Sequence, residues 1–140
     1  MKRLKKISIA LLSATVLSAT AQQSTYTYSV PDKPWGEGMG NHRAVIEVKS
    51  PAEAVELRLD WRRGDDASNQ KRFLIINAQT GDTIPNVQKL QVNNESCDIV
   101  FGPVSKAGTY YFYYLPYRVQ PGQGSYWYGY LNDVPADSVW

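Results

Sequence analysis

Cysteine and histidine are almost absent from this 140-residue sequence, which contains one of each, Cys97 and His42. A single cysteine excludes an internal disulfide, and a single histidine excludes metal sites and triads that need several such side chains. No nucleophile or orienting partner stands at a recognisable spacing from His42, so we interpret it as a structural histidine at a strand entrance. The sequence therefore points to no catalytic residue, no metal ligand and no cofactor.

Long apolar runs are missing beyond the N-terminus. The first six residues carry four cations and precede a short apolar run over residues 7–19, and small residues follow at Ala19 and Ala21. This pattern is typical of a secretory signal peptide, here residues 1–21, with cleavage before Gln22. The alternative is an N-terminal membrane anchor, but the run is short for a bilayer and no stop-transfer pattern follows. We expect export to the periplasm or beyond the cell, with no membrane span after cleavage.

A clustered basic face is also missing. Loss of the four cations in the signal peptide lowers the formal net charge from +2 to about −2 for the mature chain. The local basic group of Arg58, Arg62 and Arg63 is interrupted by Asp60 and followed by acidic residues. Nucleic-acid binding needs a basic patch or stripe, so we expect no nucleic-acid partner.

Short strand-like segments separated by turn residues make up most of the mature chain. Gly, Pro, Asn and Asp clusters separate them, and no window shows a helical apolar period. The expected strands are residues 43–48, 53–61, 72–78, 87–92, 97–101, 109–115 and 126–131. Such spacing is typical of an all-β fold, here a single β-sandwich of the jelly-roll or immunoglobulin-like kind.

These strands define the expected domain organisation. A lead-in segment over residues 22–41 follows the signal peptide, and the β-sandwich domain covers residues 42–131. Residues 132–140 form a C-terminal segment, for which a truncated linker and a natural C-terminal loop both remain open. One domain is what about 119 mature residues can support with its own core.

One of the expected strands shows a strict alternation. Val55, Leu57, Leu59 and Trp61 fall on one side of the segment, and the residues between them are charged. A period of two indicates a strand with one buried face. We therefore expect these four side chains to point into the core.

Paired carboxylates are the chemistry of glycoside hydrolysis, so Asp65 and Asp66 need to be weighed. They lie in a hydrophilic segment between two strands, where Asp and Asn commonly bond to the backbone, and we interpret them as turn residues that face water. A calcium site with Asn69 is an alternative, although the spacing matches no defined calcium loop. A small hydrolase that uses Asp65 or Asp66 with His42 is the last-ranked alternative for function.

Aromatic residues are the most informative feature of the mature chain. Residues 110–114 place aromatic rings on both faces of one strand, and more aromatics follow from residue 117 to residue 130. One face packs the core. The other either offers rings to a glycan or is covered by a neighbouring domain. The candidate carbohydrate contacts are Trp127, Tyr128, Tyr130, Tyr111 and Tyr113.

Three strings together resemble a known family. Residues 40–45 (GNHRAV), 60–63 (DWRR) and 108–117 (GTYYFYYLPY) are similar to the N-terminal β-sandwich domain of glycoside hydrolase family 123-like proteins exported by Bacteroidota. In that family, the resemblance implies, a (β/α)-barrel follows the sandwich and uses an adjacent Asp-Glu pair to cleave N-acetylhexosaminides. The sequence has no Asp-Glu dipeptide, and a barrel alone needs about 250 residues.

The resemblance therefore implies a non-enzymatic role. We expect an exported accessory domain that supports or positions a catalytic barrel, which is the expected partner together with a possible glycan. The alternative is a free-standing carbohydrate-binding module that uses exposed Trp and Tyr residues.

Overall fold

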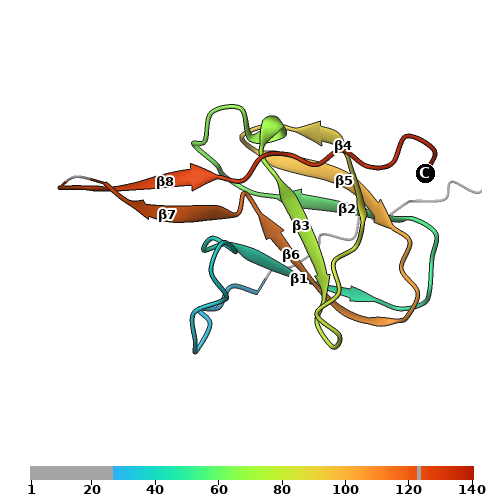
Figure 1. Cartoon of the computed structure of the whole chain (residues 1–140). Coiled ribbons are helices and arrows are strands. Elements are labelled where there is room, and N and C mark those ends of the chain that lie inside the picture. Colours follow the sequence, from blue (N-terminus) through green and yellow to red (C-terminus); the bar gives the residue numbers. More distant parts are fainter. Residues whose placement is uncertain (1–26, 123) are drawn as a thin grey trace, which may run out of the picture. The chain divides into compact units, whose positions relative to one another are not determined.

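The computed structural model of the chain describes residues 27–122 and 124–140, and residues 33–140 form one compact unit (Figure 1). The expected signal peptide, residues 1–21, and its cleavage site before Gln22 lie outside the described residues. Within the described part, no helix has the length and apolar character that crossing a membrane requires. The compact unit consists mainly of strands, joined by loops and by a 3₁₀ turn over Ser68–Gln70.

The strands form two three-stranded antiparallel sheets and a two-stranded ribbon. One sheet has the order β1-β6-β3 and the other β2-β5-β4, while β7 pairs only with β8. The expected all-β fold is thus confirmed. The strand bounds are β1 (Arg43–Val48), β2 (Val55–Asp60), β3 (Phe73–Asn77), β4 (Asn86–Val92), β5 (Ser96–Gly102), β6 (Gly108–Tyr114), β7 (Tyr117–Pro121) and β8 (Tyr126–Tyr130).

Side-chain alternation places one face of each three-stranded sheet in a shared core. On β2, Leu57 lies opposite Ile99 of β5 and packs against the core, while its neighbours Glu56 and Arg58 are exposed. Trp61, just after the strand, is buried. The expected inward face of this strand is confirmed, because a pleated strand directs alternate side chains to opposite faces.

Aromatic rings connect the two sheets. Phe112 of β6 is fully buried, and its ring centroid lies 5.1 Å from that of Phe73 on β3. Phe73 in turn meets Trp61 edge-on, with centroids 5.8 Å apart. The indole N–H of Trp61 donates a 2.8 Å hydrogen bond to the Asn93 carbonyl, which satisfies its polar group inside the core. Edge-to-face packing of this kind adds to the stabilisation from burial alone.

The chain leaves the sandwich at a bend between β6 and β7. Leu115 has a φ of 56°, a left-handed conformation that costs an ordinary residue about 1–2 kcal/mol. Its side chain is only 2% exposed, and this burial holds the residue in place. Pro116 follows, and its carbonyl accepts a 3.0 Å hydrogen bond from the Leu131 N–H at the far end of β8. This backbone hydrogen bond therefore joins the residues that directly precede and follow the two-stranded ribbon.

Strand β7 is an addition to the strands expected from the sequence. Pro116 and the Pro- and Gly-containing segment after residue 120 are typical breakers, so the residues between them did not predict a strand. In the structure, Pro116 directly precedes the strand and Pro121 is its last residue. Pairing with β8 supplies the hydrogen bonds that make the segment extended.

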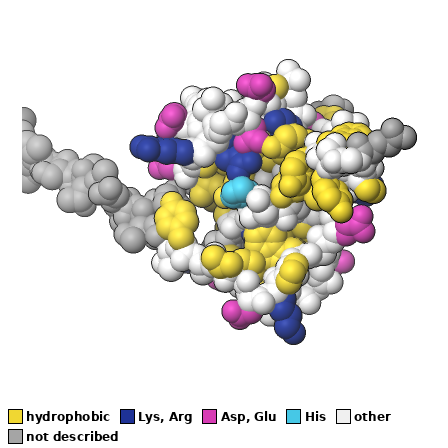
Figure 2. Space-filling view, turned by 90° about the vertical axis from the view of Figure 1, so that its left-hand side faces the viewer, with side chains coloured by type: hydrophobic (Ala, Val, Ile, Leu, Met, Phe, Trp, Pro, Cys, Tyr) yellow, Lys and Arg dark blue, Asp and Glu magenta, His cyan; other side chains and the backbone are white. Residues whose placement is uncertain are grey.

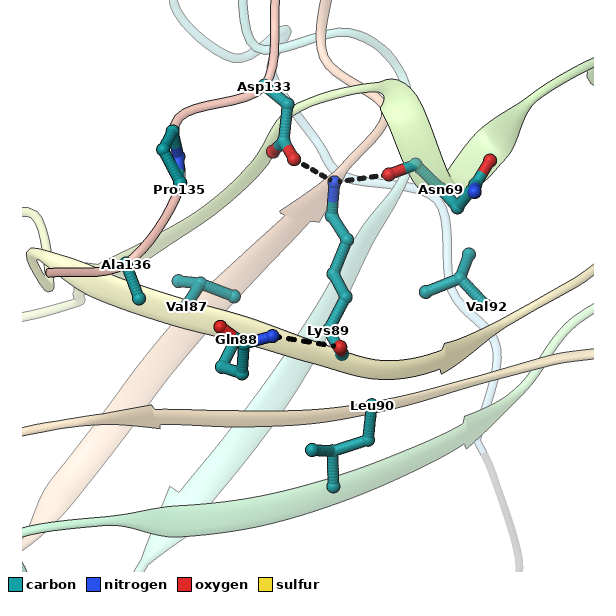
Figure 3. A pocket seen from close by; sticks show the side chains of 9 residues that line it. All are labelled: Asn69, Val87, Gln88, Lys89, Leu90, Val92, Asp133, Pro135 and Ala136. Atoms are coloured by element: carbon teal, nitrogen blue, oxygen red, sulfur yellow. Dashed lines mark hydrogen bonds and ion pairs between the residues drawn. The ribbon is translucent and has the colours of Figure 1, made fainter. Parts of the chain in front are cut away.

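A lysine side chain ties the C-terminal segment to the sandwich (Figure 3). Lys89 lies on β4, and its Nζ donates to the carbonyls of Asn69 (2.9 Å) and Lys71 (2.6 Å). The same ammonium forms a 2.8 Å ion pair with Asp133. Further along, the Asp137 N–H donates to the Asn86 side chain at 2.9 Å. Residues 132–140 thus pack along β4.

Candidate functional site

The β7–β8 hairpin, called the ribbon below, projects from one end of the sandwich (Figure 1). Residues directly opposite each other in an antiparallel pair share a face, and successive pairs alternate between the two faces. The pairs Tyr117–Tyr130, Val119–Tyr128 and Pro121–Tyr126 form one face, called the tyrosine face. The pairs Arg118–Gly129 and Gln120–Trp127 form the other, called the tryptophan face.

The tyrosine face is aromatic along its whole length and largely open to solvent. Tyr126 and Tyr128 are exposed, the latter by 62%. The ring of Tyr117 meets those of Tyr128 and Tyr130 edge-on, at 5.2 Å and 6.1 Å between centroids. These contacts hold the rings of Tyr128 and Tyr130 in place and leave that of Tyr128 exposed. Aromatic residues in such numbers on an open surface mark an interaction site more than a solvated strand.

The tryptophan face has a different chemistry. The indole of Trp127 lies along it and remains 53% exposed. Gly122 makes room for the ring, because a Cβ there would lie 3.2 Å from Trp127 Cδ1, whereas one at Gly129 would lie at an ordinary contact distance of 3.9 Å from Cζ3. Gln120 lies directly across the ribbon from Trp127, and Arg118 lies across from Gly129. The sequence-predicted contacts Trp127 and Tyr128 therefore point to opposite sides of the ribbon.

A cluster of charged groups lies at the end of the tyrosine face that is nearest the sandwich. The Tyr130 hydroxyl donates a hydrogen bond to Asp65, and Arg63 Nε donates to the same carboxylate at 2.7 Å. Lys71 Nζ lies 3.8 Å from the centre of the Tyr130 ring and 4.0 Å from Asp65. Figure 2, which looks onto this end, shows basic, acidic and histidine side chains beside hydrophobic ones. This cluster anchors the ribbon to the loop after β2.

The position of Asp65 corrects one expectation. The sequence indicated a turn residue facing water, but the Asp65 side chain is only 13% exposed because Arg63, Lys71 and Tyr130 surround it. Asp66 does face solvent. Tyr130 comes from a strand 65 residues away in sequence, so no local pattern could have placed its hydroxyl here.

Electrostatics at this cluster favour an ionised carboxylate. Burial alone would raise the pKa of Asp65, but the hydrogen bonds from Tyr130 and Arg63 and the charges of Arg63 and Lys71 outweigh it, so that the pKa is lowered. The hydrogen bond to Asp65, followed by burial, raises the pKa of Tyr130. Both shifts follow from a donated hydrogen bond that favours the carboxylate anion and the neutral phenol.

His42 lies close to this cluster. Its ring centroid is 5.5 Å from that of Tyr114, and Arg63 Cζ lies 5.9 Å from the same Tyr114 ring. Burial and then the Arg63 charge lower the pKa of His42, while the Asp65 charge opposes them. The structure therefore brings His42 and Asp65 into one neighbourhood. However, the ion-pair partners of Asp65 are Arg63 and Lys71, and these cations stabilise its ionised carboxylate.

Tyr111 and Tyr113 lie on the outer face of β6, away from the ribbon's exposed rings. Tyr113 is only 6% exposed, meets Trp35 edge-on at 5.4 Å, and accepts a 3.5 Å hydrogen bond from Arg43. The Arg43 guanidinium lies 4.0 Å from the centre of the Tyr111 ring and 5.0 Å from that of Trp35. The chain's own cation thus occupies these rings, and Tyr113 does not offer its ring to a ligand.

Outside the ribbon lie a hollow beside Lys89 and the candidate calcium ligands. An open hollow of about 360 Å³ lies beside Lys89, whose ammonium is fully engaged by two carbonyls and Asp133 (Figure 3). Within the described ranges, no three His, Cys, Asp or Glu side chains come together as metal ligands. The carbonyl of Asn69, one of the candidate calcium ligands, instead accepts from Lys89.

Comparison with known proteins decides the family. The profile described as glycoside hydrolase 123, N-terminal domain, matches residues 33–140, which is most of the chain and the whole compact unit. The chain belongs to this family. No curated protein and no solved structure gave a match.

This glycoside hydrolase 123 N-terminal domain carries its exposed aromatics chiefly on the ribbon. The family assignment confirms the resemblance seen in the sequence and places the chain with an accessory domain of a glycoside hydrolase family. The match is to the N-terminal domain of the family and not to a catalytic one.

Proposed function

We propose that the chain is an exported, non-catalytic accessory domain that docks onto a catalytic barrel of the glycoside hydrolase 123 family and positions it, in the periplasm or outside the cell. The observation that carries the proposal is the tyrosine face. It presents four tyrosines with Val119 and Pro121 on one side of a projecting ribbon. Tyrosine combines a large apolar area with a polar tip, which is why it is enriched in protein interfaces.

The state of Asp65 supports a non-catalytic role. A general acid for glycoside cleavage needs a carboxyl group with a raised pKa, because it must stay protonated near neutral pH. The pKa of Asp65 is instead lowered, and its oxygens are engaged by Arg63 and Tyr130. Asp66 is exposed to solvent. Asp65 therefore anchors the ribbon.

The anchored base also supports docking. A ribbon that swung freely would lose conformational entropy on binding, whereas one held in place loses less. Here the Tyr130–Asp65 hydrogen bond and the Leu131–Pro116 backbone hydrogen bond fix the base, and Tyr117 holds the Tyr128 ring. The tyrosine face is thus preorganised as a docking surface.

Association with a catalytic barrel tests the docking. The purified mature chain should bind a glycoside hydrolase 123 barrel encoded in the same genome, measured by analytical ultracentrifugation and calorimetry. Tyr128→Ala should weaken this association by about tenfold or more, a loss of about 1.4 kcal/mol. Trp127→Ala is the matched control, since it removes an exposed aromatic ring from the opposite face and should leave association unchanged. No association, or equal losses in both variants, would contradict the docking.

A turnover assay tests the non-catalytic role separately. The chain alone should release no aryl alcohol from aryl N-acetylgalactosaminides or N-acetylglucosaminides. Asp65→Asn and Asp66→Asn should change nothing in this assay. Turnover that either substitution abolishes would establish a small hydrolase instead.

A further inference from the structure

We propose that the tryptophan face of the ribbon binds a glycan, with one pyranose ring stacked on the indole of Trp127 and hydrogen-bonded by Gln120 and Arg118. The inference rests on the proposed function in one respect, because carbohydrate as the ligand class follows from the role in a carbohydrate-active protein. The geometry of the site is independent of whether the tyrosine face docks a barrel. The two faces then have separate partners.

The Trp127 indole lies against the backbone of the ribbon. Its five-membered ring lies over Gly122 and its six-membered ring over Gly129, and a side chain at Gly122 would crowd it. The ribbon backbone covers one side of the ring system, and 53% of the residue remains exposed. An aromatic ring supported from beneath gives a ligand a defined surface at little entropic cost.

Two polar side chains lie beside the ring on the same face. Gln120 lies directly opposite Trp127, and Arg118 lies one pair further toward the base on the same face. Both are exposed, and neither side chain forms a hydrogen bond or ion pair with another described residue. A Cβ added at Gly38 would lie 3.4 Å from Arg118 Nε, so the backbone at Gly38 passes close to this side chain. The face therefore offers free amide and guanidinium groups next to an aromatic surface.

The chemistry of this face matches that of a pyranose. An aromatic ring has a negative face, which attracts the positively polarised C–H groups of a pyranose. The hydroxyl groups at the edge of the same sugar need donors and acceptors, and Gln120 supplies both while Arg118 supplies donors. Binding sites of this kind combine apolar area with a few placed polar groups. Among the described residues, the tyrosine face places only the apolar Val119 and Pro121 beside its outer rings, whose polar groups are their own hydroxyls, so a glycan fits the tryptophan face better.

A titration of the mature chain with sugars tests the proposal. The probes are N-acetylgalactosamine, the tetramer of N-acetylglucosamine, and glucose tetramers with β-1,4 and α-1,4 linkages. The readout is the indole N–H signal of Trp127 in a ¹⁵N NMR spectrum, assigned by its disappearance in Trp127→Ala. At least one probe should shift this signal in a saturable way. Trp127→Ala should weaken its binding by about tenfold or more, as measured by calorimetry.

Two further variants separate stacking from a general change in the ribbon. Gln120→Ala should weaken binding by a smaller factor, since it removes hydrogen bonds but not the ring. Gly122→Ala should also weaken it, because the new Cβ would lie 3.2 Å from the indole and 2.9 Å from the Ser125 carbonyl, which forces the ring to move. Tyr128→Ala should leave sugar binding unchanged, because its ring is on the other face.

The outcomes separate this inference from the proposed function. If no probe binds, or if Trp127→Ala binds as well as the unaltered chain, the glycan site is wrong, while barrel docking through Tyr128 still stands. If Tyr128→Ala abolishes sugar binding and Trp127→Ala does not, the glycan lies on the tyrosine face and the inference is overturned. If Trp127→Ala instead abolishes self-association of the chain, the tryptophan face binds a second copy and not a sugar.

Discussion

Replacing Leu57 with alanine should lower the free energy of unfolding by about 2 kcal/mol, whereas replacing its neighbour Arg58 should lower it by less than about 1 kcal/mol. The change removes three carbon atoms, and each buried methylene group contributes about 0.8 kcal/mol. Leu57 is half-buried on an edge strand and packs against the core opposite Ile99, so its cost falls at the low end for a core leucine. Arg58 pairs with Asp60 (3.3 Å) and Asp98 (3.0 Å) on the surface, where ion pairs contribute little.

Urea denaturation followed by circular dichroism measures both values. The midpoint of Leu57→Ala should fall without a change in the slope of the transition, because the surface exposed on unfolding stays nearly the same. In a thermal melt, the same loss lowers Tm by roughly 8–16 °C for a domain of about 100 residues. Equal losses for the two variants, or a larger loss for Arg58→Ala, would refute the assigned faces of β2.

Three further results are expected. Burial raises the pKa of the Cys97 thiol to about 12, so Ellman's reagent should react with it only after unfolding, and rapid reaction of the native chain at pH 8 would show that the thiol is accessible. Because the pKa of His42 is lowered in the folded chain, the unfolded chain binds a proton at higher pH, and the free energy of unfolding should fall as the pH drops below about 6.5. His42→Gln should lack this fall. The lowered pKa of Asp65 should add a further loss of stability below about pH 3.8, which Asp65→Asn should lack. Mass spectrometry of the exported chain should find Gln22 at its N-terminus, and a retained Met1 would exclude cleavage.

Much of the sandwich could be predicted from the sequence because its strands alternate. The run from Val55 to Trp61 determines its own inward face by period two, and the turn residues between strands set the spacing. The same rule applies to the ribbon. Because Trp127 and Tyr128 are adjacent in a strand, they must lie on opposite faces, and this division is already contained in their numbering.

The anchored base of the ribbon could not be predicted in this way. Arg63 and Asp65 stand in a polar segment that is typical of a solvated turn, and only the folded chain brings Tyr130 onto them. A local sequence pattern carries no information about a hydrogen bond between groups 65 residues apart. The strand β7 was missed for a related reason, since its partner β8 and not its own composition makes it extended.

The ammonium of Lys89 makes the C-terminal segment part of the cooperative unit of the fold. Detaching residues 132–140 would break the ion pair between Asp133 and the Lys89 ammonium, which also holds the carbonyls of Asn69 and Lys71. Protein segments that share such groups open together, as measured by amide hydrogen exchange. The N–H of Asp137, which is bonded to Asn86, should therefore exchange with the protection of β4 and not with that of a fraying terminus.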